Sequence, residues 1–247
     1  MREAQLVRVG GAGWNIPRDS AGEFPADGSH LERYSRVFNC VEINSSFYRE
    51  HRLSTWERWR DSVPGGFQFS VKAPRAITHD AKLRCEPEVL SKFLQQVEML
   101  RKKLGPILFQ LPPSLAFDRE SVTAFLTMLR QHFAGDVVWE PRHKSWFEED
   151  ATETLGSFSV ARVAADPACV PTAAYPGAAS KVVYFRLHGS PRRYYSTYDE
   201  DFLVGLAAKL AEFAATAKTW CVFDNTASGA ATRNALELTR ELSPRRS

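Results

Sequence analysis

The stretch VVYFRLHGS, residues 182–190, is the segment on which the interpretation of the fold depends. Side chains of a strand alternate between two faces, so Arg186 and His188 share one face while Phe185 and Leu187 share the other. The rest of the strand is apolar and is expected to be buried. A buried charge is tolerated only when it is paired and hydrogen-bonded. Arg186 and His188 therefore require charged or polar partners from elsewhere in the chain.

Other short apolar runs have the length and composition of strands. They are residues 6–14, 40–48, 67–74, 107–113, 137–142, 158–166 and 220–225. Segments with the apolar spacing of helices separate most of them, and the clearest is 87–104. The connection 166–181 has no helical pattern and is expected to be a loop.

Alternating strands and helices predict the α/β class with parallel strands. Eight strands in a chain of 247 residues favour one closed (β/α)8 TIM barrel, with residues 1–247 forming a single domain. An open doubly wound sheet is the alternative. It is less favoured because the glycines at 10–13 do not form the GxGxxG motif that nucleotide-binding sheets use.

Composition narrows the class of protein further. The net charge of +3 is too small to indicate a nucleic-acid-binding protein by itself. The four cysteines form no CxxC pair, so we expect reduced thiols with no zinc site. The N-terminus lacks an apolar signal core, and the longest apolar stretch contains charged residues. We therefore expect a cytoplasmic protein that does not associate with membranes.

Polar side chains are concentrated at the carboxyl ends of the predicted strands, where barrel enzymes have their active sites. Three carboxylates and three fixed cations fall there, which is a balanced set. We predict catalytic roles for His188, Glu140, Asp224 and Lys72. We predict substrate-binding roles for Arg142, Arg186, Glu42, Asn44, Tyr48, Gln110, Asn225, Trp14 and Trp146. A salt-bridge network with a purely structural role is the alternative for the same residues.

The cations favour an enzyme that acts on a small anionic substrate, phosphorylated or sugar-like. Barrels often bind phosphate at the loops after their last two strands, here 189–193 and 224–231. Arg142 and Arg186 can bind an anion in a bidentate manner, and His188 is suited to acid/base chemistry near neutral pH.

Other functions remain open at this point. His188 with the three carboxylates could bind a metal ion in a hydrolase or isomerase, although no HxH or HExxH motif occurs. Two carboxylates could hydrolyse a glycoside. The chain could also be a non-catalytic protein that binds a metabolite or, less favoured, a nucleic acid through the arginine- and tyrosine-rich segment 190–201. No cofactor and no oligomeric state can be named.

Seven motifs occur in order along the chain: GGAGW, VEINSSFYR, FSVKAPRAITH, GPILFQLPPS, VVWEPRHKSW, YFRLHG and VFDNTASGAA. Together, from about residue 8 to residue 240, they resemble the signatures of the family named domain of unknown function 72, the YecE-like proteins. This resemblance implies a TIM-barrel fold and does not imply a particular reaction. Every predicted site residue lies within one of these motifs.

Overall fold

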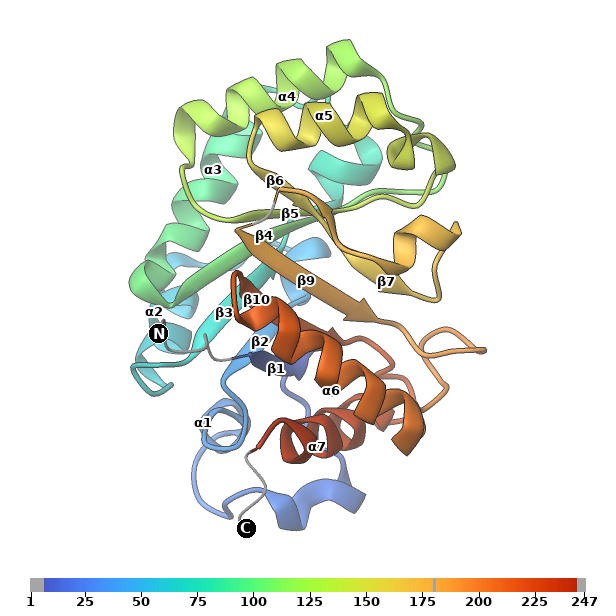
Figure 1. The fold of residues 1–247 in the computed structure, drawn as a ribbon. Coiled ribbons are helices and arrows are strands. Elements are labelled where there is room, and N and C mark those ends of the chain that lie inside the picture. The colour runs from blue at the N-terminus through green and yellow to red at the C-terminus, as the bar shows by residue number, and fades with distance from the viewer. Residues whose placement is uncertain (1–6, 180, 244–247) are drawn as a thin grey trace.

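Strands occupy the centre of the molecule and helices lie around them in the computed structural model, which describes residues 7–179 and 181–243 (Figure 1). Leu6, the start of the first predicted strand, lies outside the described residues. Most of the N-terminal segment in which no signal core was expected also lies outside the described residues. The same holds for both ends of the predicted domain 1–247. No helix in the described part of the chain has the length and apolar character needed to cross a membrane.

The strands form two sheets. The four-stranded sheet is parallel and has the order β1 (Arg8–Gly11), β10 (Lys218–Phe223), β9 (Val182–Leu187) and β7 (Ala164–Asp166). The six-stranded sheet has the order β2 (Cys40–Ile43), β3 (Gln68–Lys72), β4 (Leu104–Gln110), β5 (Val137–Glu140), β6 (Val160–Arg162) and β8 (Gly177–Ala178), in which only the β6–β8 pair is antiparallel.

Helices follow most of the strands, as the alternating pattern predicts. They are α1 (His30–Ser35), α2 (Leu53–Asp61), α3 (Pro87–Val97), α4 (Arg119–His132), α5 (Glu149–Ser157), α6 (Glu200–Ala214) and α7 (Ala230–Leu242). The structure also has short 3-10 helices, which are η1 (Arg18–Glu23), η2 (Ser45–Phe47), η4 (Glu98–Lys103), η5 (Lys144–Phe147) and η6 (Pro171–Ala174). The element η3 (Ala76–Asp80) is a turn of π-helix. Figure 1 shows α3, α4 and α5 beside one group of strands and α6 and α7 beside the other.

A closed (β/α)8 barrel is not shown, because the two sheets do not form one continuous ladder. Between β1 and β2 there is a single parallel bridge, Ala12 to Glu42, and the Gly13 N–H donates to the Glu42 carbonyl at 2.9 Å. The segment predicted as one strand, 158–166, is divided: β6 pairs with β5, and β7 pairs with β9. The α/β class is confirmed. The predicted loop 166–181 contains the short elements η6 and β8 and, over its described residues 166–179 and 181, no α-helix.

The close approach of β1 to β2 has a local cause. A Cβ atom on Gly10 would lie 2.2 Å from the carbonyl oxygen of Cys40, so only glycine fits at this seam. The backbones pack directly against each other there, and the regular ladder is reduced to the bridge at Ala12.

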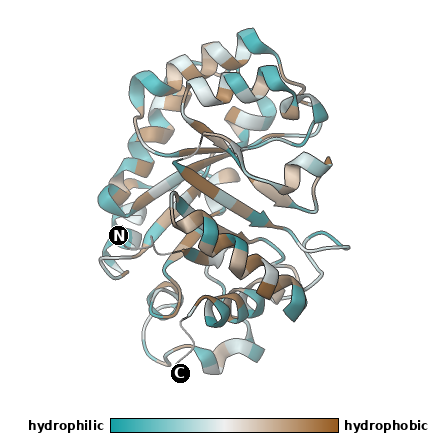
Figure 2. Ribbon diagram, viewed as in Figure 1, coloured by the Kyte–Doolittle hydropathy of each residue, from teal (hydrophilic) through white to brown (hydrophobic). Residues whose placement is uncertain are grey.

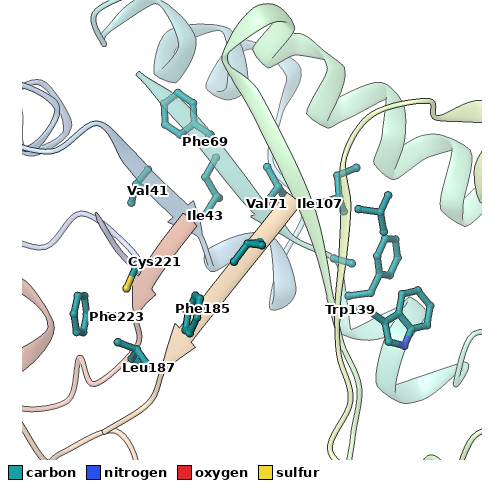
Figure 3. Packing of buried hydrophobic residues seen from close by; sticks show 14 of the residues in the cluster. Val41, Ile43, Phe69, Val71, Ile107, Trp139, Phe185, Leu187, Cys221 and Phe223 are labelled. Atoms are coloured by element: carbon teal, nitrogen blue, oxygen red, sulfur yellow. The ribbon is translucent and has the colours of Figure 1, made fainter. Parts of the chain in front are cut away.

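Side-chain alternation divides the buried residues into two clusters. The larger cluster lies between the strands and the helices and includes Val183, Phe185 and Leu187 of β9 (Figure 3). The smaller cluster includes Tyr184 and, from both sheets, Cys40, Leu108, Val138, Ala161, Val163, Val182, Trp220 and Val222. The two sheets therefore face each other across a shared interior. In Figure 2 the strands are the most hydrophobic part of the ribbon, and hydrophilic residues gather on the helices.

Candidate functional site

Charged side chains replace the apolar ones at the carboxyl ends of the inner strand faces. Two residues beyond Cys40 the inner face carries Glu42, and two beyond Tyr184 it carries Arg186, as alternation requires. The residues that meet at this end are Glu42, Lys72, Glu140, Arg142, Arg186, His188 and Asp224, here called the ionic cluster. The structure thus brings together all four residues predicted to be catalytic.

Arg186 is the centre of the ionic cluster and is fully buried. Its Nε and Nη2 donate to the two carboxylate oxygens of Glu42 at 3.0 and 2.8 Å, a bidentate pair. Its Nη1 donates to Glu140 Oε2 at 3.1 Å, and Nη2 lies 3.0 Å from Asp224 Oδ2. Burial would lower the pKa of Arg186, but these three carboxylates hold it well above its usual range. The guanidinium is therefore a permanent charge with its donors in use.

His188 has a carboxylate at each ring nitrogen. Nδ1 lies 3.0 Å from Asp224 Oδ2, and Nε2 lies 2.8 Å from Glu140 Oε1. Arg142 Nη2 approaches the same Glu140 oxygen at 2.6 Å and lies 3.0 Å from His188 Nε2. An Nε2 without its proton can therefore accept from Arg142, whereas a bare Nδ1 would face only the Asp224 oxygen. His188 is thus placed between Asp224 at Nδ1 and both Glu140 and Arg142 at Nε2.

Both carboxylates beside His188 are held in their ionised form. Burial raises the pKa of the Glu140 carboxyl, but the charges of Arg142 and Arg186 outweigh burial and keep it well below its usual range. The same balance, with burial opposed by Arg186 and by the hydrogen bond from His188, lowers the pKa of Asp224. These groups are hydrogen-bond acceptors at neutral pH.

Lys72 has a different environment from the arginines. Among the described residues no carboxylate oxygen lies within 4.0 Å of its ammonium, which is instead placed over the Phe47 ring at 4.1 Å from the ring centre. Burial, and next the charge of Arg186, lower the pKa of Lys72 to about 8. Lys72 is thus a cation of the cluster whose ammonium forms no ion pair with a described carboxylate.

The comparisons with known proteins agree with the motifs. Residues 8–247 match the model of a family described as "Protein of unknown function DUF72". The chain belongs to the DUF72 family. It is 34% identical over 131 residues to UPF0759 protein YecE of Escherichia coli K12, a match that covers 51% of this chain and 47% of that protein. It is 29% identical over 161 residues to UPF0759 protein YunF of Bacillus subtilis 168, covering 62% and 56%.

The matches span about half the length of these curated relatives. Solved structures of the family align over nearly the whole chain. A DUF72 protein of Thermotoga maritima MSB8 has a TM-score of 0.78 at 28% identity, covering 96% of this chain and 99% of that one. A DUF72 protein of Enterococcus faecalis V583 has a TM-score of 0.81 at 22% identity, covering 96% and 95%, and supports the fold alone. The family therefore supplies a fold and no assigned reaction.

Three predicted site residues lie at the rim of the cluster. The side-chain oxygens of Asn44 and Asn225 are buried without a hydrogen-bond partner, and the Asn225 amide donates to the Ser196 carbonyl and to Asn234. Gln110, at the end of β4, is paired in register with Glu140 and is half-buried. Asn44 follows β2, which carries Glu42, Asn225 is adjacent to Asp224, and Gln110 is in register with Glu140 on the neighbouring strand.

The predicted aromatic wall is not brought together. Trp14 packs edge-on against Trp59 at 5.2 Å between ring centres, and Trp146 is fully buried, with its Nε1 donating to the Leu115 carbonyl at 2.8 Å. Tyr48 is 74% exposed and lines a cavity of about 260 Å³ beside η2 and η3. These side chains lie in the helix layer or at the surface, so their predicted contacts with a substrate stay predictions.

Two residues next to the ionic cluster, Tyr184 and Ser70, were not predicted as site residues from the sequence. The Tyr184 hydroxyl lies 3.0 Å from both Glu42 Oε2 and Ser70 Oγ, below the ionic layer. Both follow from alternation, because each precedes a cluster residue by two positions on the same face. Tyr194 packs its ring edge-on to His188 at 5.8 Å, and its N–H donates to the His188 carbonyl. Tyr194 belongs to the arginine- and tyrosine-rich segment 190–201, which the sequence offered as a possible ligand contact.

The carboxylates of the ionic cluster are arranged around cationic side chains rather than around a metal site. No group of three or more His, Cys, Asp and Glu side chains within residues 7–179 and 181–243 has the geometry to bind a metal ion. Arg186 fills the space between Glu42, Glu140 and Asp224, with N–O distances of 2.8 to 3.1 Å. The carboxylates of Glu42, Glu140 and Asp224 therefore form ion pairs with Arg186 in this structure.

Proposed function

We propose that the protein is an acid/base enzyme whose substrate is a small anionic molecule, phosphorylated or sugar-like. The observation that carries the proposal is His188, fully buried, with Asp224 at Nδ1 and both Glu140 and Arg142 at Nε2. General acid/base catalysis commonly uses a histidine that is held in place by its neighbours and exchanges a proton through one ring nitrogen.

The role of each residue follows from its contacts. Asp224 fixes the imidazole, and Glu140 accepts a hydrogen bond from a protonated Nε2, whereas Arg142 can donate to Nε2 once that nitrogen has lost its proton. Lys72 and Arg142 have donors that the protein leaves unused, since Arg142 Nε is buried without a partner. Cations with spare donors favour an anionic group on the substrate. Arg186, whose donors are occupied, maintains the cluster and does not contact the substrate.

We further propose that the two sheets act as one barrel-like enclosure around this site. The Ala12–Glu42 bridge and the continuity of chain from β6 to β7 support it. The proposed ligand is a free metabolite rather than a nucleic acid. The cationic side chains are buried at the carboxyl ends of the strands and do not form an exposed basic surface. The cytoplasmic location stays a prediction.

Hydrogen exchange on carbon tests the proposed function without knowledge of the product. The full chain is incubated in D₂O with a panel of sugar phosphates and hydroxy acids, and NMR records deuterium uptake next to the substrate carbonyl or hydroxyl. We expect exchange with at least one anionic compound, and its loss in His188→Asn with binding retained. In Arg142→Gln we expect weaker binding of the same compound.

The matched control is His132→Asn, which changes an exposed histidine of α4 and is expected to leave exchange and binding unchanged. If the panel binds without exchange in the unmodified protein, the chain is a metabolite-binding protein and the proposed catalysis is wrong. If His188→Asn loses melting temperature and leaves exchange intact, His188 belongs to the structural network only.

A further inference from the structure

We infer that Lys72 is a carbonyl-reactive amine, which forms a Schiff base with an anionic aldehyde or ketone bound at the ionic cluster. This inference rests on the proposed function, because it names the substrate class of the same site. It also assigns to Lys72 a covalent step that anion binding alone does not require.

The contacts of Lys72 set it apart from the other cations. Arg142 lies 2.6 Å from Glu140, and Arg186 bridges three carboxylates, whereas the Lys72 ammonium has no carboxylate within 4.0 Å in the described part of the chain. A lysine that stabilised the fold as a counter-ion would be expected to contact one of the three. Lys72 is instead held over the Phe47 ring, a contact that positions the side chain without placing a carboxylate at its nitrogen.

The position of Lys72 also favours access. It is the last residue of β3, and 6% of its surface is exposed, while Arg186 and His188 have 0%. Burial and the neighbouring Arg186 charge bring the pKa of Lys72 to about 8. Roughly a tenth of the molecules then carry the neutral, nucleophilic amine at pH 7. Desolvation and an adjacent cation are the two devices that activate lysine nucleophiles in enzymes.

The substrate class follows from the neighbouring cation. Arg142 has an unpartnered Nε, and both Arg142 and Lys72 belong to the ionic cluster around Glu140. A molecule with a carboxylate or phosphate bound to Arg142 can place a nearby carbonyl carbon at Lys72. Oxo acids and keto or aldehyde sugar phosphates have this combination of groups.

The covalent step balances without an oxidant or a cofactor. The neutral amine attacks the carbonyl carbon, so a carbon–nitrogen bond forms and the carbonyl oxygen takes up a proton. The carbon–oxygen bond then breaks, and that oxygen leaves as water. Overall, the Lys72 ammonium and the carbonyl compound become an iminium ion and one water molecule, with the positive charge conserved.

Reductive trapping tests the inference. The full chain is treated with glyoxylate or pyruvate and cyanoborohydride at pH 8, and mass spectrometry measures the adduct at each lysine. Lys92 and Lys218 are internal references, because their side chains are 61% and 62% exposed and carry ordinary surface ion pairs. We expect Lys72 to be labelled several-fold faster than either, although accessibility alone would give the opposite order.

Two variants sharpen the result. Lys72→Arg retains the positive charge and is expected to remove the fast adduct while the reference lysines react as before. Arg142→Gln is expected to slow labelling by pyruvate but not by an uncharged aldehyde such as propionaldehyde. Labelling of Lys72 no faster than Lys92 and Lys218 overturns the inference.

Calorimetry with inorganic phosphate separates this failure from failure of the proposed function. If phosphate binds the unmodified protein and Arg142→Gln abolishes binding, while Lys72 remains unreactive, the Schiff base is wrong and the anion site stands. If neither phosphate binding nor carbon hydrogen exchange is found, both proposals fail.

Discussion

At the scale of the residue, Lys72 and Arg186 show two ways to place a cation inside a protein. Arg186 engages three carboxylates and gains charge-assisted hydrogen bonds, whereas Lys72 is desolvated without an ion pair. The first arrangement strengthens the charged state and the second weakens it. Their substitutions should therefore affect stability in opposite directions at neutral pH.

Lys72→Met should be more stable than the unmodified protein at pH 7. The folded pKa of about 8 lies below the ordinary value of 10.5, so between these values the folded chain binds fewer protons than the unfolded chain. Stability linked to Lys72 therefore rises with pH across this window, by up to about 3 kcal/mol. Urea unfolding at pH 7 to 10 should show the advantage of Lys72→Met shrinking as the pH rises. If the difference in the free energy of unfolding between the two proteins stays constant from pH 7 to 10, the pKa of Lys72 is not lowered by burial.

Arg186→Met should lower the free energy of unfolding by about 3–5 kcal/mol, because it leaves buried carboxylates without their partner. Arg240→Met is the matched control, since Arg240 forms an exposed pair with Glu23 at 2.8 Å. Its effect should stay below about 1 kcal/mol. Equal effects of the two substitutions in urea titrations would show that the buried cluster does not stabilise the fold.

At the scale of the element, the seam between β1 and β2 is the most constrained backbone contact. Gly10→Ala should be strongly destabilising, by more than about 2 kcal/mol, because its Cβ would overlap the Cys40 carbonyl and the sheets would have to separate. Gly22→Ala in η1 is the control, because a Cβ there meets no atom within 4 Å. Thermal unfolding measures the stability of both variants. Similar melting temperatures for the two variants would show that the contact between β1 and β2 tolerates a Cβ atom at position 10.

The sequence predicted the faces of strand β9 correctly, but it did not predict the division of segment 158–166 or the orientation of Trp146. The alternation of β9 is local, and it correctly assigned Phe185 to the outer face and Arg186 and His188 to the inner one. The division of 158–166 into β6 and β7 was missed because the choice of partner strands is not local: each half pairs with a different sheet. Trp146 was expected in the site, but η5 turns it into the helix-facing core.

At the scale of the whole molecule, the ionic cluster links pH to global stability. The pKa values of Glu140 and Asp224 are lowered in the folded state, so the stability they contribute is complete above their unfolded pKa values and is lost as the pH falls through the folded ones. We expect unfolding below about pH 4.5 to be steepened by these groups. Glu140→Gln should flatten the acid dependence of the free energy of unfolding, whereas Glu120→Gln, at an exposed site, should not.

The α/β class and the convergence of charges at one end were predictable because both depend on periodicity and on where strands end. The absence of a continuous ladder between the two sheets was not predictable. Eight apolar runs give the number of strands, but they do not determine how the first and sixth strands pair with their neighbours. The detailed pairing within the cluster, such as Tyr184 with Glu42, required coordinates.

The span of the Arg186 contacts has a consequence for biosynthesis. Its hydrogen bonds reach 144 residues back to Glu42, and its ion pair with Asp224 reaches forward beyond β10. During translation, Arg186 and Glu42 emerge from the ribosome before Asp224 does, so a nascent chain that still lacks β10 and Asp224 has an open interior with an incomplete set of counter-ions. We therefore expect the packing around Arg186 to form only after β10 and Asp224 have been synthesised, as a single event rather than progressively.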